Sequence, residues 1–162
     1  MLFRSYKPGI KNLRSINIGL DLRNDGMINY QNTIEFLRMV PKFCNGIVKC
    51  ELRIYSLNRM FAKPLLDIVK LQPLKSSLIR INDKDDDAKK IMYTFEFRSE
   101  TLKRLVLERL NFQKIDLSFM SKLECLERLE IKYCNGFTYN FCKILIKKKL
   151  HLKELVLWFG IF

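Results

Sequence analysis

Short stretches that alternate apolar and polar residues recur along the chain and are separated by stretches with helical spacing. The clearest three are residues 102–107, 126–131 and 152–157, and each reads apolar-x-x-apolar-x-apolar. Because side chains alternate sides along a strand, each stretch predicts a short strand with one buried face. Between these stretches the apolar residues return every three or four positions, which predicts helices or helical turns.

The spacing of the strands identifies a repeat. The first apolar residues of the clear copies, Leu102, Leu126 and Leu152, are 24 and then 26 residues apart. This motif and this period are the signature of a leucine-rich repeat, a unit that buries its core only by stacking on copies of itself. A good fourth copy, with Ile in place of Leu, lies upstream at residues 13–18, and two degenerate copies lie at residues 47–52 (with Cys50 in a leucine position) and 76–81. The sequence therefore predicts an α/β fold, a leucine-rich-repeat solenoid (horseshoe segment) of about six repeats, with short parallel strands on its concave face and helices on its convex face.

The expected strands and helices can be placed along the chain. The last inward residue of each strand is expected at positions 18, 52, 81, 107, 131 and 157. A first helix carries apolar residues at a spacing of three, and Pro41 should end or distort it; these residues are Ile34, Leu37, Val40 and Phe43. A second is marked by Leu65, Leu66, Val69 and Leu71 and should stop at Pro73. Residues 91–95, 119–123 and 141–146 mark three more.

The residues between the inward positions must point outward onto the concave face. They include Arg, Tyr and Trp, which are the types that dominate protein interfaces. In the third strand we expect Leu78, Arg80 and Asn82 on this face, with Arg80 in its middle column. Each position can also be interpreted as a merely solvated strand residue. The candidate protein-binding residues are Arg53, Tyr55, Arg80, Arg104, Glu108, Arg128, Glu130, Lys132, Glu154 and Trp158.

The net charge of +13, with a pI near 9.7, raises the hypothesis of a phosphate-bearing partner. The chain has only two alanines but many Lys, Asn, Ile and Phe residues, a bias typical of AT-rich coding that inflates lysine content. The basic residues are also scattered, apart from residues 147–149, which would end a helix and be favoured there by its dipole. Nucleic acid is therefore not the expected partner.

Residues for catalysis or metal binding lack the required patterns. The five cysteines form no C-x-x-C pair, and His151 is the single histidine. We expect reduced cysteines buried as small apolar side chains. The acidic run at residues 83–87 lacks the glycine and the terminal glutamate of a calcium loop, and is expected to lead into the third helix. No nucleotide-binding or nucleophile-elbow glycine motif is present, so no enzyme activity, metal or cofactor is expected.

Residues 134–138, Cys-Asn-Gly-Phe-Thr, follow the strand at residues 126–131 and resemble the cysteine-containing leucine-rich repeat of F-box proteins. Residues 39–45, 95–102 and 121–126 are similar to the same group, and the likeness is to the F-box-like families expanded in arbuscular mycorrhizal fungi. It covers most of the chain, from about Leu13 to Phe162. In that family an F-box docks on the adaptor of an SCF ubiquitin ligase while the repeats hold the substrate. The resemblance implies a substrate-recognition part, because the 12 residues before Leu13 are too few for an F-box.

One domain, residues 1–162, is expected, as a fragment of a longer F-box/leucine-rich-repeat protein. No run approaches the roughly 18 apolar residues that span a bilayer, and residues 1–10 lack the apolar core of a signal peptide. We therefore expect a cytoplasmic or nuclear protein without membrane contact. Its partner would be an unknown protein substrate, with a ligase adaptor only if an F-box lies upstream. Two alternatives stay open, a basic binder of nucleic acid or anionic surfaces and a degenerate, truncated paralogue without function.

Overall fold

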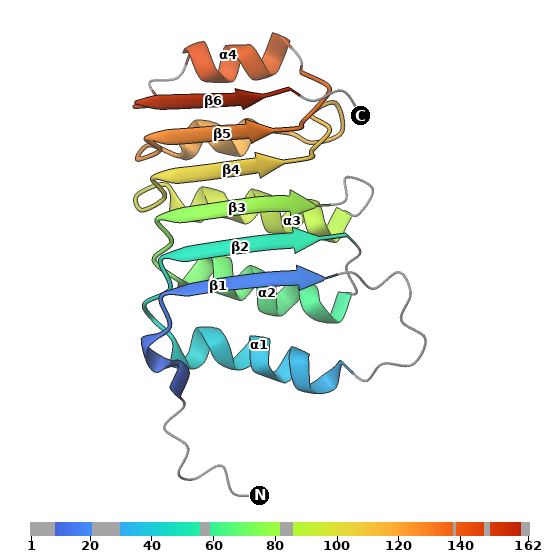
Figure 1. Cartoon of the computed structure of the whole chain (residues 1–162), viewed down its shortest axis with the longest axis vertical. Coiled ribbons are helices and arrows are strands. Elements are labelled where there is room, and N and C mark those ends of the chain that lie inside the picture. The colour runs from blue at the N-terminus through green and yellow to red at the C-terminus, as the bar shows by residue number, and fades with distance from the viewer. Residues whose placement is uncertain are drawn as a thin grey trace, which may run out of the picture.

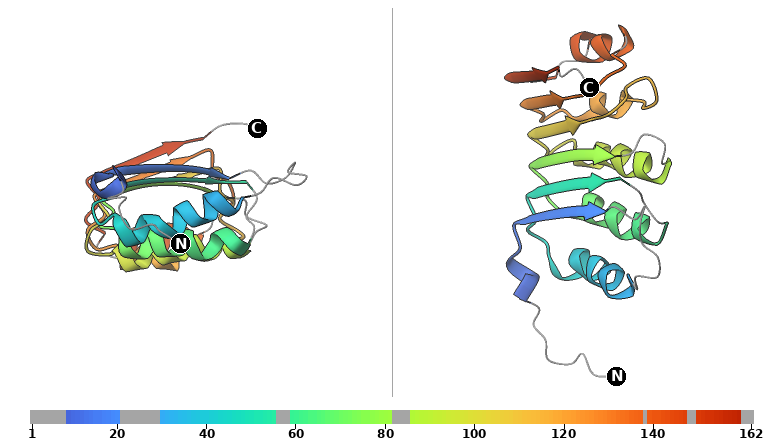
Figure 2. Two further views of the ribbon diagram at one scale, coloured as in Figure 1. Left: turned by 90° about the horizontal axis from the view of Figure 1, so that it is seen from below. Right: turned by 45° about the vertical axis from the view of Figure 1, so that its right-hand side comes forward.

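A computed structural model describes residues 9–20, 30–55, 59–81, 86–137, 139–147 and 150–159. Six strands form one sheet, and they are parallel and lie in chain order (Figure 1). The helices cover one face of this sheet and leave the other face bare (Figure 2). The predicted α/β alternation with a parallel sheet is therefore confirmed. The strands are β1 (Ser15–Leu20), β2 (Lys49–Ile54), β3 (Ser76–Ile81), β4 (Arg104–Glu108), β5 (Arg128–Lys132) and β6 (Glu154–Trp158).

The five segments that connect the strands differ in their helical structure. They contain four α-helices, namely α1 (Gln31–Phe43), α2 (Arg59–Leu71), α3 (Asp86–Tyr93) and α4 (Tyr139–Lys147). They also contain two 3-10 turns, η2 (Thr94–Arg98), which follows α3, and η3 (Ser118–Lys122), while a further 3-10 turn, η1 (Gly9–Asn12), precedes β1. In both Figure 1 and Figure 2, α1 lies beyond β1 at one end of the stack and α4 lies beyond β6 at the other. The layer of helices is thus longer than the layer of strands.

The core lies between the helices and the inward side chains of the strands. The inward positions of β1 to β5 are 8% exposed or less, and the one polar residue among them is Ser77. Cys50 occupies a leucine position with no exposed surface, as expected. The hydroxyl of Ser77 donates to the carbonyl of Cys50 at 2.9 Å, so this polar group has a partner inside the core.

Each repeat begins with the same backbone arrangement. The carbonyl of Arg14 accepts two hydrogen bonds from the next repeat, from the N–H of Val48 at 2.9 Å and that of Lys49 at 3.1 Å. The carbonyls of Val48, Lys75, Lys103 and Glu127 do the same at the following joins. This recurrence aligns six equivalent units even where their sequences differ.

The third repeat was aligned wrongly from the sequence. The strand pairing places Leu78 beside Glu51 and Val106, so Leu78, and not Arg80, belongs to the middle column of the face. The last inward residue equivalent to Leu52 and Leu107 is Ile79, two positions before the predicted one. The motif here begins at buried Leu74, and its second apolar position is taken by Ser77, which removed the signal.

The predicted helices are present over the described residues, with corrections. Pro41 does not end α1, which continues to Phe43. Phe43 and Leu71, which were expected on the apolar sides of the first two helices, are exposed, because a helix turns by about 100° per residue and carries them away from the buried side. Cys44 and Ile68 are buried in the core in their place. The predicted fourth helix is the 3-10 turn η3. α4 ends at Lys147, while Lys148 and Lys149, residues 83–85 of the acidic run, and Asn82, which was expected on the concave face, lie outside the described residues.

Two consecutive strand ends share a left-handed residue. Arg109 (φ 54°) follows β4 and Tyr133 (φ 56°) follows β5. The N–H of Arg109 donates to the carbonyl of Lys132, and that of Tyr133 donates to the carbonyl of Trp158, both at 2.9 Å. One residue further on, the buried thiol of Cys134 accepts the N–H of Leu110 at 3.4 Å. These bonds join the loops that follow the C-terminal ends of neighbouring strands.

The cysteine prediction is partly wrong. Cys44, Cys50 and Cys134 are buried and unbridged, but Cys125 and Cys142 are exposed. In the described part of the chain, no three His, Cys, Asp or Glu side chains gather closely enough to hold a metal ion. No helix within the described ranges has the length and apolar character that a membrane crossing requires.

Candidate functional site

The candidate site is the open face, defined here as the face of the sheet opposite the helices. Strand alternation turns three side chains of each strand onto it, and the register arranges them in three rows across the sheet. The first row is Ser15, Lys49, Ser76, Arg104, Arg128 and Glu154. The middle row is Asn17, Glu51, Leu78, Val106, Glu130 and Val156. The last row runs from Gly19 through Arg53, Arg80, Glu108 and Lys132 to Trp158.

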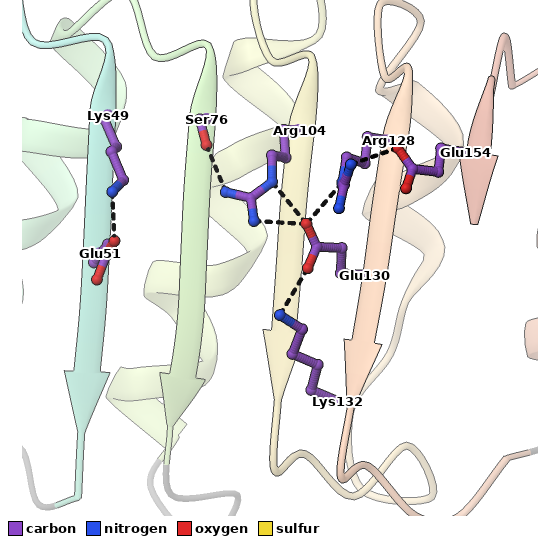
Figure 3. Close-up of polar contacts among 8 residues, drawn as sticks. All are labelled: Lys49, Glu51, Ser76, Arg104, Arg128, Glu130, Lys132 and Glu154. Atoms are coloured by element: carbon purple, nitrogen blue, oxygen red, sulfur yellow. Dashed lines mark hydrogen bonds and ion pairs between the residues drawn. The ribbon is translucent and has the colours of Figure 1, made fainter. Parts of the chain in front are cut away.

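Glu130 is the centre of an ion-pair cluster on β4 and β5. Its carboxylate contacts Arg104 at 2.6 Å, Arg128 at 2.8 Å and Lys132 at 2.7 Å (Figure 3). Its side chain is only 3% exposed, whereas those of the three cations are 30–40% exposed. Burial alone would raise the pKa of Glu130, but the hydrogen bonds from the cations outweigh it and lower the pKa to about 2. Glu130 is therefore ionised and inaccessible, and its role is to hold its neighbours.

The cluster continues to both sides along the first row. Arg128 also pairs with Glu154 on β6 at 2.5 Å, and Arg104 donates to the hydroxyl of Ser76 on β3 at 3.4 Å (Figure 3). Val106, next to Glu130 in the middle row, has no exposed surface although it points away from the core. The centre of the open face is thus closed by its own long side chains, and four strands are tied together there.

Two smaller groups order the N-terminal half of the face. On β2, Glu51 pairs with Lys49 at 2.8 Å and with Arg53 at 3.0 Å. The hydrogen bond from Lys49 is the main reason why the pKa of Glu51 is lowered. Arg53 also donates to the side-chain oxygen of Asn17 on β1 at 3.1 Å.

Arg80 joins two of the predicted residues across the last row. Its guanidinium lies 4.7 Å from the ring centroid of Tyr55 and 3.3 Å from the carboxylate of Glu108. Arg80 is therefore held between β2 and β4 by a cation–π contact and an ion pair.

The open face is charged but nearly balanced. Across the six strands it carries six basic and four acidic side chains, a net charge of +2, and each of these ten residues takes part in an ion pair. The chain as a whole carries +13. Most of the basic excess therefore lies elsewhere, and this face does not form the concentrated basic patch of a phosphate binder.

The structure brings the predicted residues onto one surface. Nine lie on the open face of β2 to β6, and Tyr55 follows β2 directly and stacks with Arg80. Glu130 differs from the expectation because it is buried beneath its partners. Trp158 is 53% exposed at the far end. Alternation along the strands placed Lys49 and Val106 on this face, although neither was a binding candidate. Ser76 was missed because the third strand was misaligned.

The fold and this face define a class, an α/β protein whose all-parallel sheet is covered by helices on one side and displays a paired, charged surface on the other. No protein-family model, no curated protein and no solved structure matches the chain. The function is therefore argued from the fold and the face themselves.

Proposed function

We propose that this chain is a leucine-rich-repeat protein-binding module that uses the open face to hold a protein partner. The observation that carries the proposal is the bare face of an all-parallel sheet. Parallel sheets are normally covered on both faces, and stacked-repeat proteins are the exception that keeps one face free for binding. Here that face carries polar and charged side chains, an exposed Trp158 and a stacked Arg80–Tyr55 pair.

Three observations support the leucine-rich-repeat assignment. The six strands follow in chain order with equivalent joins, and equivalent positions recur every 24 to 34 residues at Ile18, Leu52, Ile79, Leu107, Ile131 and Leu157. Cys134 falls three residues after the last apolar position of its strand, where the motif has Asn or Cys. The longer layer of helices is the arrangement expected if the stack curves with the sheet on its inner side.

The test compares two matched triple variants. Arg80→Ala, Arg104→Ala and Trp158→Ala together remove two cations and one aromatic ring from the open face, and Glu130 keeps Arg128 and Lys132. The control, on the helix side, removes Arg38, Lys42 and Phe97, two exposed cations and one ring. After circular dichroism shows both variants to be folded, binding to captured partners is quantified. The proposal predicts loss with the open-face variant alone; retained binding, or equal loss in both, would contradict it.

The resemblance to F-box-like proteins extends the proposal to substrate recognition for an SCF ubiquitin ligase. Full-length sequencing of the native transcript tests this extension, because it requires an in-frame F-box in the same message. The alternative, binding to nucleic acid or anionic surfaces, rests on the net charge of +13. It predicts an affinity that falls by orders of magnitude between about 50 and 200 mM salt. A degenerate paralogue would bind no partner in either assay.

A further inference from the structure

The edge of β6 is unfinished on its core side. Leu155 and Leu157 occupy the positions that Leu129 and Ile131 hold in β5. The β5 residues are 0% and 1% exposed, whereas Leu155 is 46% and Leu157 43% exposed. Within the described part of the chain no strand lies beyond β6, so these two side chains lack the neighbour that every earlier inward pair has.

The backbone of β6 also presents hydrogen-bonding groups on that side. Glu154 N–H donates to Glu127 and the carbonyl of Trp158 accepts from Tyr133, so residues 154, 156 and 158 face β5. By alternation, the N–H and C=O groups of Leu155 and Leu157 face outward. The carbonyl of Lys153 is equivalent to that of Glu127, which accepts two N–H groups from β6.

The charges at this edge specify what fits beside it. Between β5 and β6, Glu127 pairs with Lys153 at 2.9 Å and Arg128 pairs with Glu154 at 2.5 Å. The side chains of Lys153 and Glu154 remain 74% and 47% exposed, so they can pair again on their free side. An incoming parallel strand would match them with an acidic residue followed by a basic one, and would then place apolar residues beside Leu155 and Leu157.

A second copy of the chain does not meet these requirements. Stacking β1 on β6 would bring Arg14 next to Lys153 and Ser15 next to Glu154, their equivalents in β6, so neither exposed charge of the edge would gain an opposite partner. Two β6 edges meeting side by side would bring together the α4 helices, which lie beyond β6 (Figure 1). A lone extended segment avoids both conflicts, and α4, with Ile146 80% exposed, lies beside the space it would enter.

We propose that the free edge of β6 accepts an extended segment of a partner protein, parallel to β6, with the pattern acidic-basic-apolar-x-apolar. The segment would add a seventh strand through main-chain hydrogen bonds, and its apolar side chains would cover Leu155 and Leu157. This second surface is distinct from the open face and does not depend on it.

The probe is a fluorescein-labelled peptide with the sequence of residues 126–132, Leu-Glu-Arg-Leu-Glu-Ile-Lys, which β6 already accepts on its other side. The matched control is the same peptide with its first glutamate and its arginine exchanged, which keeps composition and net charge. Fluorescence anisotropy should show binding of the first peptide and about tenfold weaker binding of the second. Equal affinities, or no binding of the first peptide up to about 1 mM, would overturn the proposal.

Amide hydrogen exchange locates the contact. Bound peptide should slow exchange at Leu155 and Leu157 and leave Val156, already turned toward β5, unchanged. Protection confined to other strands would also overturn the proposal. Leu157→Asp should abolish binding while Phe36→Asp on α1, an equally exposed apolar site, should not. Arg80→Ala should bind the peptide like the wild type, which separates failure at this edge from failure of the open face.

Discussion

The ion-pair cluster around Glu130 predicts a specific, pH-dependent contribution to stability. Its carboxylate has a folded-state pKa of about 2, against 4.5 for an unperturbed glutamate. A difference of about 2.5 units corresponds to about 3 kcal/mol of folding free energy. Because the folded pKa is the lower one, this stability is fully present above pH 4.5 and is lost as the pH falls towards 2. Glu130→Gln removes the charge at nearly constant volume.

The assay is urea unfolding of the wild type and Glu130→Gln at pH 7, 5, 4 and 3. The variant should be less stable by about 2–3 kcal/mol at pH 7 and pH 5, since the three cations keep partial solvation. The difference should shrink below pH 4.5. Glu154→Gln, which removes an exposed carboxylate with one cation partner, should cost below about 1 kcal/mol. A Glu130→Gln effect under about 0.5 kcal/mol at pH 7, or one that stays constant down to pH 3, would refute the reasoning.

Three further predictions concern buried and strained positions. The side chain of Gln72 is buried (1% exposed), donates to the carbonyl of Cys44 at 2.7 Å and accepts the N–H of Ile47 at 3.3 Å. Gln72→Leu should lower the free energy of unfolding, measured in urea, by about 2 kcal/mol, because both backbone groups lose their buried partner. An unchanged free energy of unfolding would contradict this prediction. Gly136 has φ +68°, and a Cβ at this position would lie 2.4 Å from the side-chain oxygen of Asn111. Gly136→Ala should therefore lower the thermal unfolding midpoint. Gly19→Ala, where a Cβ would have open space around it, should change the midpoint far less. A thiol reagent should rapidly modify the two exposed cysteines, Cys125 and Cys142, in the native protein. The three buried cysteines should react only after unfolding, because burial in the folded protein raises the pKa of Cys50 to about 12 and that of Cys134 to about 11. Rapid modification of all five would be contrary evidence.

The sequence predicted the strands well because their period-two pattern is local. The motif at residues 102–107, 126–131 and 152–157 identified β4, β5 and β6, and the outward residues followed from alternation alone. The third repeat was misaligned because Ser77 fills an apolar position, and its acceptability depends on a hydrogen bond to Cys50 in the neighbouring strand. Such a contact is set by the fold and has no signature in the local pattern.

The site could be predicted as a list of residues but not as an arrangement. Each candidate is an outward Arg, Lys, Glu, Tyr or Trp, and the structure brings them onto one face. The burial of Glu130 could not be predicted, because it depends on Arg104, which lies 26 residues away in the neighbouring strand, as well as on Arg128 in its own strand. Gln72 was missed for the same reason, because a single glutamine in a loop carries no periodic signal.

The repeated join, in which one carbonyl accepts two N–H groups of the next repeat, has a consequence for how this architecture varies. The sheet side is held in constant register, while the other side contains a 13-residue α-helix in one repeat and a five-residue 3-10 turn in another. Insertions and deletions between strands therefore change the outer layer without rotating any side chain from the open face into the core. Whole repeats can be gained or lost in the same way. The open face can therefore gain or lose strands without a change in the residues of the remaining strands, and its residues can change without a change in the number of strands.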